Sequence, residues 1–147
     1  MAGKFQFAST AFDNIVAYAE RLTATLPKEL TVAGFVNSGS EANEAAFKLA
    51  RRWGQKMRGG AHEIIGFEGG FHGRTLAMMA ASGKPGWGTL YPPMPTGFAK
   101  ARFNDLRSVE AAITPATVAV MIELVQGEAG VNIADPGFVR ELRALTQ

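Results

Sequence analysis

The sequence predicts an α/β fold, a mostly parallel sheet flanked by helices. Short apolar segments rich in β-branched residues alternate along the chain with longer segments whose apolar residues recur at helical spacing. Alternating β and α units of this kind favour a parallel sheet that is covered by helices. The length of 147 residues and the hydrophobic content of 47% are typical of one soluble globular domain.

In the first half of the chain, a capping box at Thr10 and Asp13 indicates the start of a helix. The apolar residues of this helix are Phe12, Ile15, Ala19 and Leu22. Residues 31–36 predict a buried strand, and an amphipathic helix follows it. The apolar stripe of that helix consists of Ala42, Ala45, Ala46, Leu49, Ala50 and Trp53. Residues 63–67 predict a second strand, and residues 74–82 predict a further helix.

In the second half, residues 83–103 contain four glycines and four prolines and predict an ordered loop over the surface. Asp105 is expected to cap the next helix. Residues 117–125 are the longest strand candidate, because apolar and β-branched residues occur throughout. Asp135 followed by Pro136 predicts the start of a last helix, since an acidic cap and a proline at the first helical position are typical of helix N-termini.

The composition excludes several classes of protein. The formal net charge is only +2, and one basic cluster is interpreted as a solvated helix end, so no nucleic-acid partner is expected. That cluster consists of Lys48, Arg51, Arg52, Lys56 and Arg58. No apolar run approaches the roughly 18–20 residues that cross a bilayer, so no membrane association is expected. The chain has no cysteine and only two histidines, which argues against a metal site and fits a cytoplasmic location.

The turn Asn37-Ser38-Gly39-Ser40 lies between a predicted strand and a predicted helix. In parallel sheets, ligands bind at the carboxyl ends of the strands, and a helix N-terminus attracts anions, phosphate above all. Gly39 permits close approach of the backbone to a ligand, and the hydroxyls of Ser38 and Ser40 are able to donate to a phosphate oxygen. A plain capping box from Ser38 to Glu41 that binds nothing is the alternative interpretation.

The second strand leads into the loop Glu68-Gly-Gly-Phe71-His72-Gly-Arg74. Phe71 beside an anion site suggests a flat, phosphorylated ligand, and Arg74 is suited to hold a carboxylate bidentately. Core packing of Phe71 and a surface position of Arg74 are the alternatives. His72 has no carboxylate neighbour in the sequence and is interpreted as a packed residue.

The third strand leads into Gln126-Gly-Glu128-Ala-Gly-Val131, with Glu123 just before it. Carboxylates at this edge of a sheet are costly unless they are paired or used. Three strand-end loops are therefore predicted to bring anion-binding, stacking and charged groups to one edge.

The segments NSGSEANEAAFKLAR, GFHGRT and ELVQGEAGV, in this order, resemble the class III (ornithine/acetylornithine-type) aminotransferases. These are pyridoxal-phosphate enzymes of fold type I. The resemblance runs from about Phe12 to Gln147 and is greatest to the acetylornithine and 4-aminobutyrate branches, which have counterparts of PPMPTGF and FNDL. Three such motifs in order are far more specific than any one of them.

The resemblance implies pyridoxal 5'-phosphate as the cofactor. Gly39 and Ser40 match the pair that binds the cofactor phosphate, and Phe71 matches the aromatic residue that stacks on the pyridine ring. Arg74 matches a substrate-contacting position of the acetylornithine enzymes. Glu128 matches a glutamate that in several members pairs with a distant arginine and swings away when a dicarboxylate binds. Two departures from the family, Leu124 for proline and Ala129 for glycine, concern the substrate side more than the cofactor side.

The resemblance also implies groups that this chain lacks, so no catalytic residue is assigned within it. The family's aspartate at the pyridine nitrogen and its Schiff-base lysine are expected beyond Gln147. The lysines of this chain lie in no matching context; they are Lys4, Lys28, Lys48, Lys56, Lys84 and Lys100. Residues 1–147 are therefore expected to form a single partial domain, the front of the cofactor-binding large domain of a homodimeric enzyme.

The complete enzyme is expected to catalyse transamination between 2-oxoglutarate and an amino donor of the acetylornithine, ornithine or 4-aminobutyrate type. This chain alone is expected to be inactive. Two alternatives are a non-catalytic remnant or assembly module of the same fold, and an unrelated α/β domain that binds a nucleotide or sugar phosphate.

Overall fold

The computed structural model describes residues 9–147, which belong to two compact units, residues 1–36 and 37–147. The sequence-based expectation of a single partial domain stays a prediction.

The first unit contains α1 (Ser9–Ala24), which confirms the first predicted helix. Thr10 lies inside this helix and is therefore not its N-cap, contrary to the predicted capping box. The prediction of a buried strand at residues 31–36 is wrong. This segment pairs with none of the strands in the described residues, and Val32 is 86% exposed. An isolated extended segment has no partner for its backbone N–H and C=O groups, so its apolar pattern alone does not make a strand.

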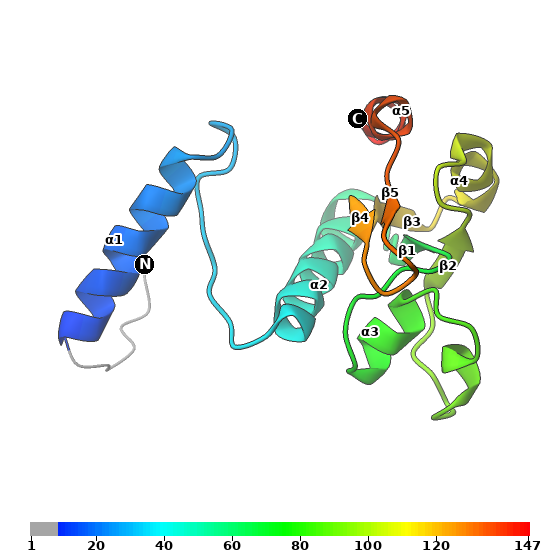
Figure 1. The fold of residues 1–147 in the computed structure, drawn as a ribbon, viewed down its shortest axis with the longest axis horizontal. Helices are drawn as coiled ribbons and strands as arrows, with labels where there is room; N and C mark the ends of the chain where they lie inside the picture. Colours follow the sequence, from blue (N-terminus) through cyan, green and yellow to red (C-terminus); the bar gives the residue numbers. More distant parts are fainter. Residues whose placement is uncertain (1–8) are drawn as a thin grey trace. The chain divides into compact units, whose positions relative to one another are not determined.

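The second unit is built on a parallel sheet of three strands in the order β2-β1-β3 (Figure 1). These strands are β1 (Glu63–Phe67), β2 (Phe98–Ala101) and β3 (Thr117–Val120). The helices are α2 (Gly39–Met57), α3 (Leu76–Ala81), α4 (Leu106–Ala112) and α5 (Pro136–Leu145), with a 3-10 turn η1 (Trp87–Thr89). A separate antiparallel pair joins β4 (Val125–Gln126) to β5 (Asn132–Ile133).

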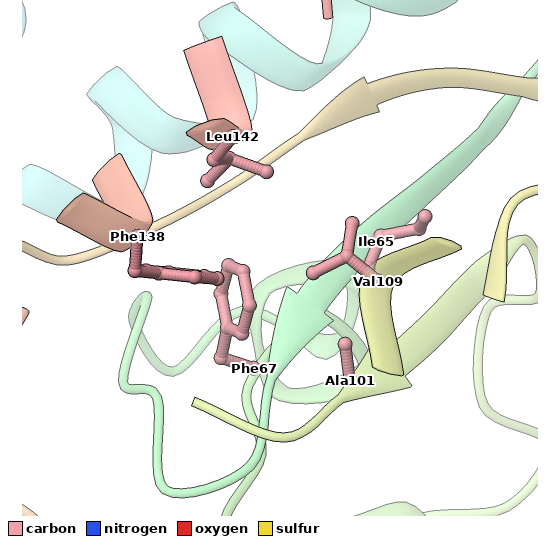
Figure 2. Close-up of a cluster of buried hydrophobic side chains, with 6 residues drawn as sticks. All are labelled: Ile65, Phe67, Ala101, Val109, Phe138 and Leu142. Atoms are coloured by element: carbon pink, nitrogen blue, oxygen red, sulfur yellow. The ribbon is translucent and has the colours of Figure 1, made fainter. Parts of the chain in front are cut away.

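Helices cover both faces of this sheet. Alternate residues of β1 point to opposite sides, so the strand presents an apolar face to the helices on each side. Ile65 and Phe67 pack against α4 and α5, and Figure 2 shows the Phe67 ring meeting Phe138 of α5. The two ring centroids are 5.8 Å apart at an interplanar angle of 82°. On the other face, Ile64 packs with side chains of α2 and α3. The predicted α/β class, a mostly parallel sheet flanked by helices, is confirmed.

Side-chain caps set several of the helix boundaries. Asp105 Oδ1 accepts a hydrogen bond from Ser108 N at 3.1 Å, which confirms the predicted cap of α4. Asp135 caps α5 with Pro136 at its start, also as predicted. The helix predicted at residues 74–82 is α3, with Thr75 as its N-cap.

Two further segments differ from the sequence-based expectation. The stretch 83–103 is not loop throughout, because it ends in β2, whose apolar pattern is interrupted by Lys100. The strand candidate 117–125 ends at Val120, and the chain then turns toward the β4–β5 pair.

The apolar stripe of α2 also differs, because Leu49 is 70% exposed while the buried residues of this helix are Phe47 and Gly54. A Cβ on Gly54 would overlap the carbonyl oxygen of Ala61, so this helix packs closely through its glycine. Within residues 9–147, no helix has both the length and the apolar composition that a membrane crossing requires.

Candidate functional site

The N-terminus of α2 is capped by its own side chains. Ser38 Oγ accepts a hydrogen bond from Glu41 N at 3.3 Å, and Glu41 Oε2 accepts one from Ser38 N at 3.1 Å. This capping box confirms that a helix begins directly after the turn. Within the described residues, no acceptor pairs with the backbone N–H of Gly39 or Ser40, and a Cβ on Gly39 would meet no atom within 4 Å. The capping box and two unpaired backbone N–H groups therefore coexist at one helix N-terminus, the kind of position that suits an anion.

The loop after β1 is fastened to this N-terminus. Ser40 Oγ accepts a hydrogen bond from Arg74 N at 3.3 Å, and Asn43 Nδ2 donates to His72 O at 2.8 Å. Thr75 Oγ1 donates to Glu44 Oε1 at 2.6 Å. The two segments that the sequence predicts at one edge of the sheet are thus held side by side.

Gly73 makes this contact possible. Its φ of +127° is a conformation that other residues rarely adopt, and a Cβ at this position would overlap the Ser40 side chain. Both the positive φ and the lack of space for a Cβ therefore favour glycine at this position.

Phe71 is half-buried beside a second ring. Its centroid is 5.9 Å from that of Trp87 in an edge-to-face arrangement. The backbone N–H of Phe71 donates to Glu123 Oε2 at 2.8 Å, so the carboxylate of Glu123 fixes the loop that presents the ring. Trp87 of the long surface segment thus contributes to the surroundings of Phe71.

His72 is buried behind the loop, as the sequence suggests. Its backbone N–H donates to Ser82 Oγ at 2.9 Å, and its ring Nε2 has no hydrogen-bond partner among the described residues. Burial, with a smaller contribution from the positive charge of Lys100, lowers the pKa of His72 to about 4. The imidazole is therefore neutral near pH 7 and acts as a packing residue.

Lys100 is held at the C-terminal end of α3. Its Nζ donates to Ala80 O at 2.7 Å and to Ala81 O at 2.8 Å, which satisfies two terminal carbonyls of that helix. Burial lowers the pKa of Lys100 to about 8. Its ammonium group thus stabilises the C-terminal end of α3.

Glu128 forms an ion pair that the sequence does not suggest. Its Oε2 lies 2.7 Å from Lys84 Nζ, and the side chains are 45% and 29% exposed respectively. The hydrogen bond and the charge of Lys84, together with the charge of Arg74, lower the pKa of Glu128. The predicted residues Arg74 and Glu128 therefore belong to one electrostatic cluster, and Lys84 is its additional member.

Two grooves help to locate the site. One, of about 510 Å³, lies beside Arg74 and is lined by Leu76, Met79, Trp87, Leu90 and Tyr91. Another, of about 520 Å³, follows β3 and contains none of the predicted site residues. Among residues 9–147, there is no group of three or more His, Cys, Asp or Glu side chains able to bind a metal ion. Of the predicted site residues, Arg74 alone lines the first groove, next to Trp87.

Comparison with known proteins places this arrangement in a family. Residues 3–147 match the family "Aminotransferase class-III". The chain belongs to the class III aminotransferases. The resemblance seen in the three sequence motifs is therefore confirmed.

Individual relatives agree with this assignment. Acetylornithine aminotransferase 2 of Bordetella pertussis is 53% identical over 146 residues, which are 98% of this chain and 36% of that relative. The chain thus spans about a third of the length of this curated relative.

Solved structures show the same fold. A transaminase from the marine bacterium Virgibacillus has a TM-score of 0.82 and 25% identity, covering 99% of this chain and 35% of its own. Ornithine aminotransferase of Toxoplasma gondii has a TM-score of 0.68 and 29% identity, covering 75% of this chain and 27% of its own.

Proposed function

We propose that the protein functions in pyridoxal-phosphate-dependent transamination between 2-oxoglutarate and an amino donor of the acetylornithine, ornithine or 4-aminobutyrate type. In this proposal the chain is the front part of the cofactor-binding domain of a longer, cytoplasmic, homodimeric enzyme. The Bordetella relative is an acetylornithine aminotransferase, and the Toxoplasma protein is an ornithine aminotransferase with PLP at partial occupancy in its active site. These names support the proposal for the present chain.

The observation that carries the proposal is the attachment of the Gly73–Arg74 backbone to Ser40. It places the open N-terminus of a 19-residue helix next to the loop of Phe71. A phosphate group fits the N-terminus, because no acceptor in residues 9–147 pairs with Gly39 N or Ser40 N and none of their side chains covers Gly39. A flat ring attached to that phosphate would lie next to the loop that carries Phe71.

Each predicted site residue then has a task. The N–H groups of Gly39 and Ser40 hold the phosphate, and Phe71 orients the ring by stacking. Arg74 and Glu128 attract the charged ends of the substrates. When bound, pyridoxal phosphate supplies a ring that takes up the electron pair released as the substrate loses its proton.

Two lysines of this chain, Lys84 and Lys100, do not suit proton transfer. Lys100 is bound to two carbonyl oxygens of α3, and Lys84 is paired with Glu128. We therefore propose that this chain binds the cofactor weakly and has no turnover by itself.

Trp87 offers a direct test of cofactor binding, because it is one of two tryptophans and lies beside Phe71. In a Trp53→Phe background, pyridoxal phosphate should quench Trp87 fluorescence, and pyridoxal without phosphate should quench it less. Ser40→Ala should weaken the response to the phosphorylated ligand. Saturation by a nucleotide or a sugar phosphate, with no response to pyridoxal phosphate, would instead favour an unrelated phosphate-binding domain.

A remnant or assembly module is separated from an enzyme by a second measurement. The complete gene product should form glutamate from 2-oxoglutarate and an amino donor. Cofactor binding without any glutamate formation would favour the non-catalytic alternative.

A further inference from the structure

A groove of about 650 Å³ lies where β1 and β2 end, beside the β4–β5 hairpin. Residues that follow the two parallel strands line one part of it, and residues of the hairpin line the other. The groove contains none of the residues assigned to the candidate cofactor and substrate site, which are Gly39, Ser40, Phe71, Arg74 and Glu128. The carboxyl ends of parallel strands form the edge at which α/β sheets bind ligands, so this groove has the position of a ligand site.

Two amide side chains that line the groove use their N–H donors inside the protein. Gln126 Nε2 donates to Glu68 O at 2.8 Å, and Asn132 Nδ2 donates to Ala129 O at 3.1 Å. Gln126 and Asn132 are opposite each other in the register of β4 and β5, so their side chains lie on the same face of this pair. Their oxygens, Oε1 and Oδ1, are left as acceptors, and no donor in the described residues pairs with either of them.

The unpaired oxygen of Gln126 belongs to a buried residue, whose exposed fraction is only 2%. A Cβ on Gly69 would lie 3.0 Å from this oxygen, so the glycine leaves the oxygen uncovered on that side. The φ of Gly69 is +76°, which also favours glycine here. An unpaired polar atom at a buried residue costs free energy, and a ligand that brings an N–H group to Oε1 would recover this cost.

The charges along the groove favour a cation. Glu68 is exposed, and its carboxylate forms no hydrogen bond or ion pair with the described residues. Arg102 also lines the groove, but its Nη2 lies 2.7 Å from Asp105 Oδ2, so its charge is compensated by a partner. Asn104 uses its Nδ2 on Ile133 O at 3.0 Å. The groove therefore offers acceptor oxygens and a negative charge without a partner.

Apolar side chains complete the groove. Val131 and Ile133 are 65% and 68% exposed, and Phe103 is half-buried. Apolar surface beside acceptor oxygens suits a ligand whose alkyl chain ends in a charged donor group. A guanidinium group fits three such acceptors well, because it is planar and carries five N–H donors.

We propose that this groove is a second ligand site, which binds a small organic cation with an alkyl chain, an alkylguanidinium or a primary alkylammonium compound. The N–H groups of the cation donate to Gln126 Oε1 and Asn132 Oδ1, and Glu68 supplies the opposite charge. The alkyl chain lies against Val131 and Ile133. Because the groove shares no residue with the proposed cofactor site, it binds its cation independently of the proposed function.

The test uses the complete gene product and butylguanidinium, with binding measured by isothermal titration calorimetry. This probe stays charged near pH 7 and, unlike a primary amine, does not form a Schiff base with pyridoxal phosphate. Glu68→Gln should raise the Kd for butylguanidinium about two- to fivefold, the range of an exposed ionic contact. Asn132→Asp should lower this Kd, because it places a negative charge at the acceptor opposite Gln126.

Matched controls separate charge from shape. Glu110→Gln removes an exposed carboxylate of α4 that does not line the groove, and it should leave the Kd unchanged. Butylurea, which has the shape of the probe without its charge, should bind more weakly and should not respond to Glu68→Gln. Methylguanidinium should also bind more weakly than butylguanidinium, and Ile133→Ser should reduce that difference.

The proposal would be overturned by an absence of butylguanidinium binding, by an unchanged Kd in Glu68→Gln, or by a higher Kd in Asn132→Asp. Equal affinity for butylurea or methylguanidinium would overturn it as well. A change in cofactor absorbance on saturation with butylguanidinium would place the cation at the cofactor site, against the proposal. A gene product without pyridoxal phosphate that still binds the probe would contradict the proposed function and support this second site.

Discussion

Ser40 Oγ accepts a hydrogen bond from the backbone N–H of Arg74 at 3.3 Å, across 34 residues of sequence. This contact joins the start of α2 to the loop after β1, and Asn43 reinforces it through His72 O. The candidate anion site and the candidate stacking ring are neighbours because of this junction. Substitutions at the junction should therefore affect ligand binding more than their exposure suggests.

Gly73→Ala is predicted to open the junction. The added methyl group would overlap Ser40, and alanine at a φ of +127° adds backbone strain on the order of 1–3 kcal/mol. We expect a lower free energy of unfolding in urea and loss of the Trp87 response to pyridoxal phosphate. Gly59→Ala is the control, because Gly59 also has positive φ, +60°, but has open space around it. Equal losses of ligand response in both variants would contradict the role of the junction.

Phe71→Leu is predicted to weaken pyridoxal phosphate binding by about two- to tenfold, since aromatic stacking contributes roughly 0.5–1.5 kcal/mol beyond area burial. The volume change is small, so the fold should persist. Cofactor absorbance after equilibrium dialysis measures the effect without relying on Trp87. Unchanged binding would place the ring of the ligand elsewhere.

The exposed apolar residues of α2 are predicted to contribute to self-association. Leu49, Trp53 and Met57 are 70%, 49% and 69% exposed and recur at helical spacing along one helix. Leu49→Gln with Trp53→Gln should shift sedimentation velocity profiles of the complete gene product toward the monomer. The exposed polar pair Lys48→Gln with Arg52→Gln serves as the control. An unchanged profile in the apolar variant would exclude this face as the contact.

The features that can be predicted from the sequence are those that depend on residues close together in the chain. The caps Ser38, Asp105 and Asp135 each act within three residues, so they can be recognised without knowledge of the fold. The glycines of the two loops also suggest a ligand-binding position, and Gly39 and Gly73 do lie at one junction, although the segment before Gly39 is not a strand.

Long-range relationships account for the rest. The pairing of Lys84 with Glu128 depends on the approach of Gly83 to the loop after β1. No periodic pattern in the sequence predicts that these two segments lie close together. The strand β2 is short and lies at the end of a glycine- and proline-rich stretch. Residues 31–36 have the apolar pattern of a strand but pair with no strand in the described residues, so the pattern predicts a strand that the structure does not contain.

His72 is predicted to make stability depend on pH. The folded state takes up its proton only near pH 4, whereas an unfolded histidine does so near its ordinary pKa of 6.5. The unfolded state therefore binds more protons between these values, and the free energy of unfolding should fall as the pH falls through this window. The slope should approach about 1.4 kcal/mol per pH unit at most.

Urea unfolding at about pH 7 and about pH 5 measures this effect and stays above the range where most carboxylates titrate. His72→Gln should lose less stability between the two conditions than the unmodified chain. His62→Gln removes the other histidine, which is exposed, and should retain the full loss. A His72→Gln profile parallel to that of the unmodified chain would assign the pH dependence to other groups.

The isolated chain is predicted to have no transaminase activity even with added pyridoxal phosphate. Gly39, Ser40 and Phe71 are proposed to bind the cofactor, but Lys84 is paired with Glu128 and Lys100 with carbonyl oxygens of α3, so neither is free to move a proton on the substrate. Since general acid–base catalysis contributes about 10²–10⁴-fold, its loss alone should bring turnover close to the background of free cofactor. Glutamate formation from 2-oxoglutarate, measured with and without the chain, checks this expectation. Turnover well above free cofactor, abolished by Lys84→Gln or Lys100→Gln, would show that one of these lysines is catalytic and that this chain contains a complete site.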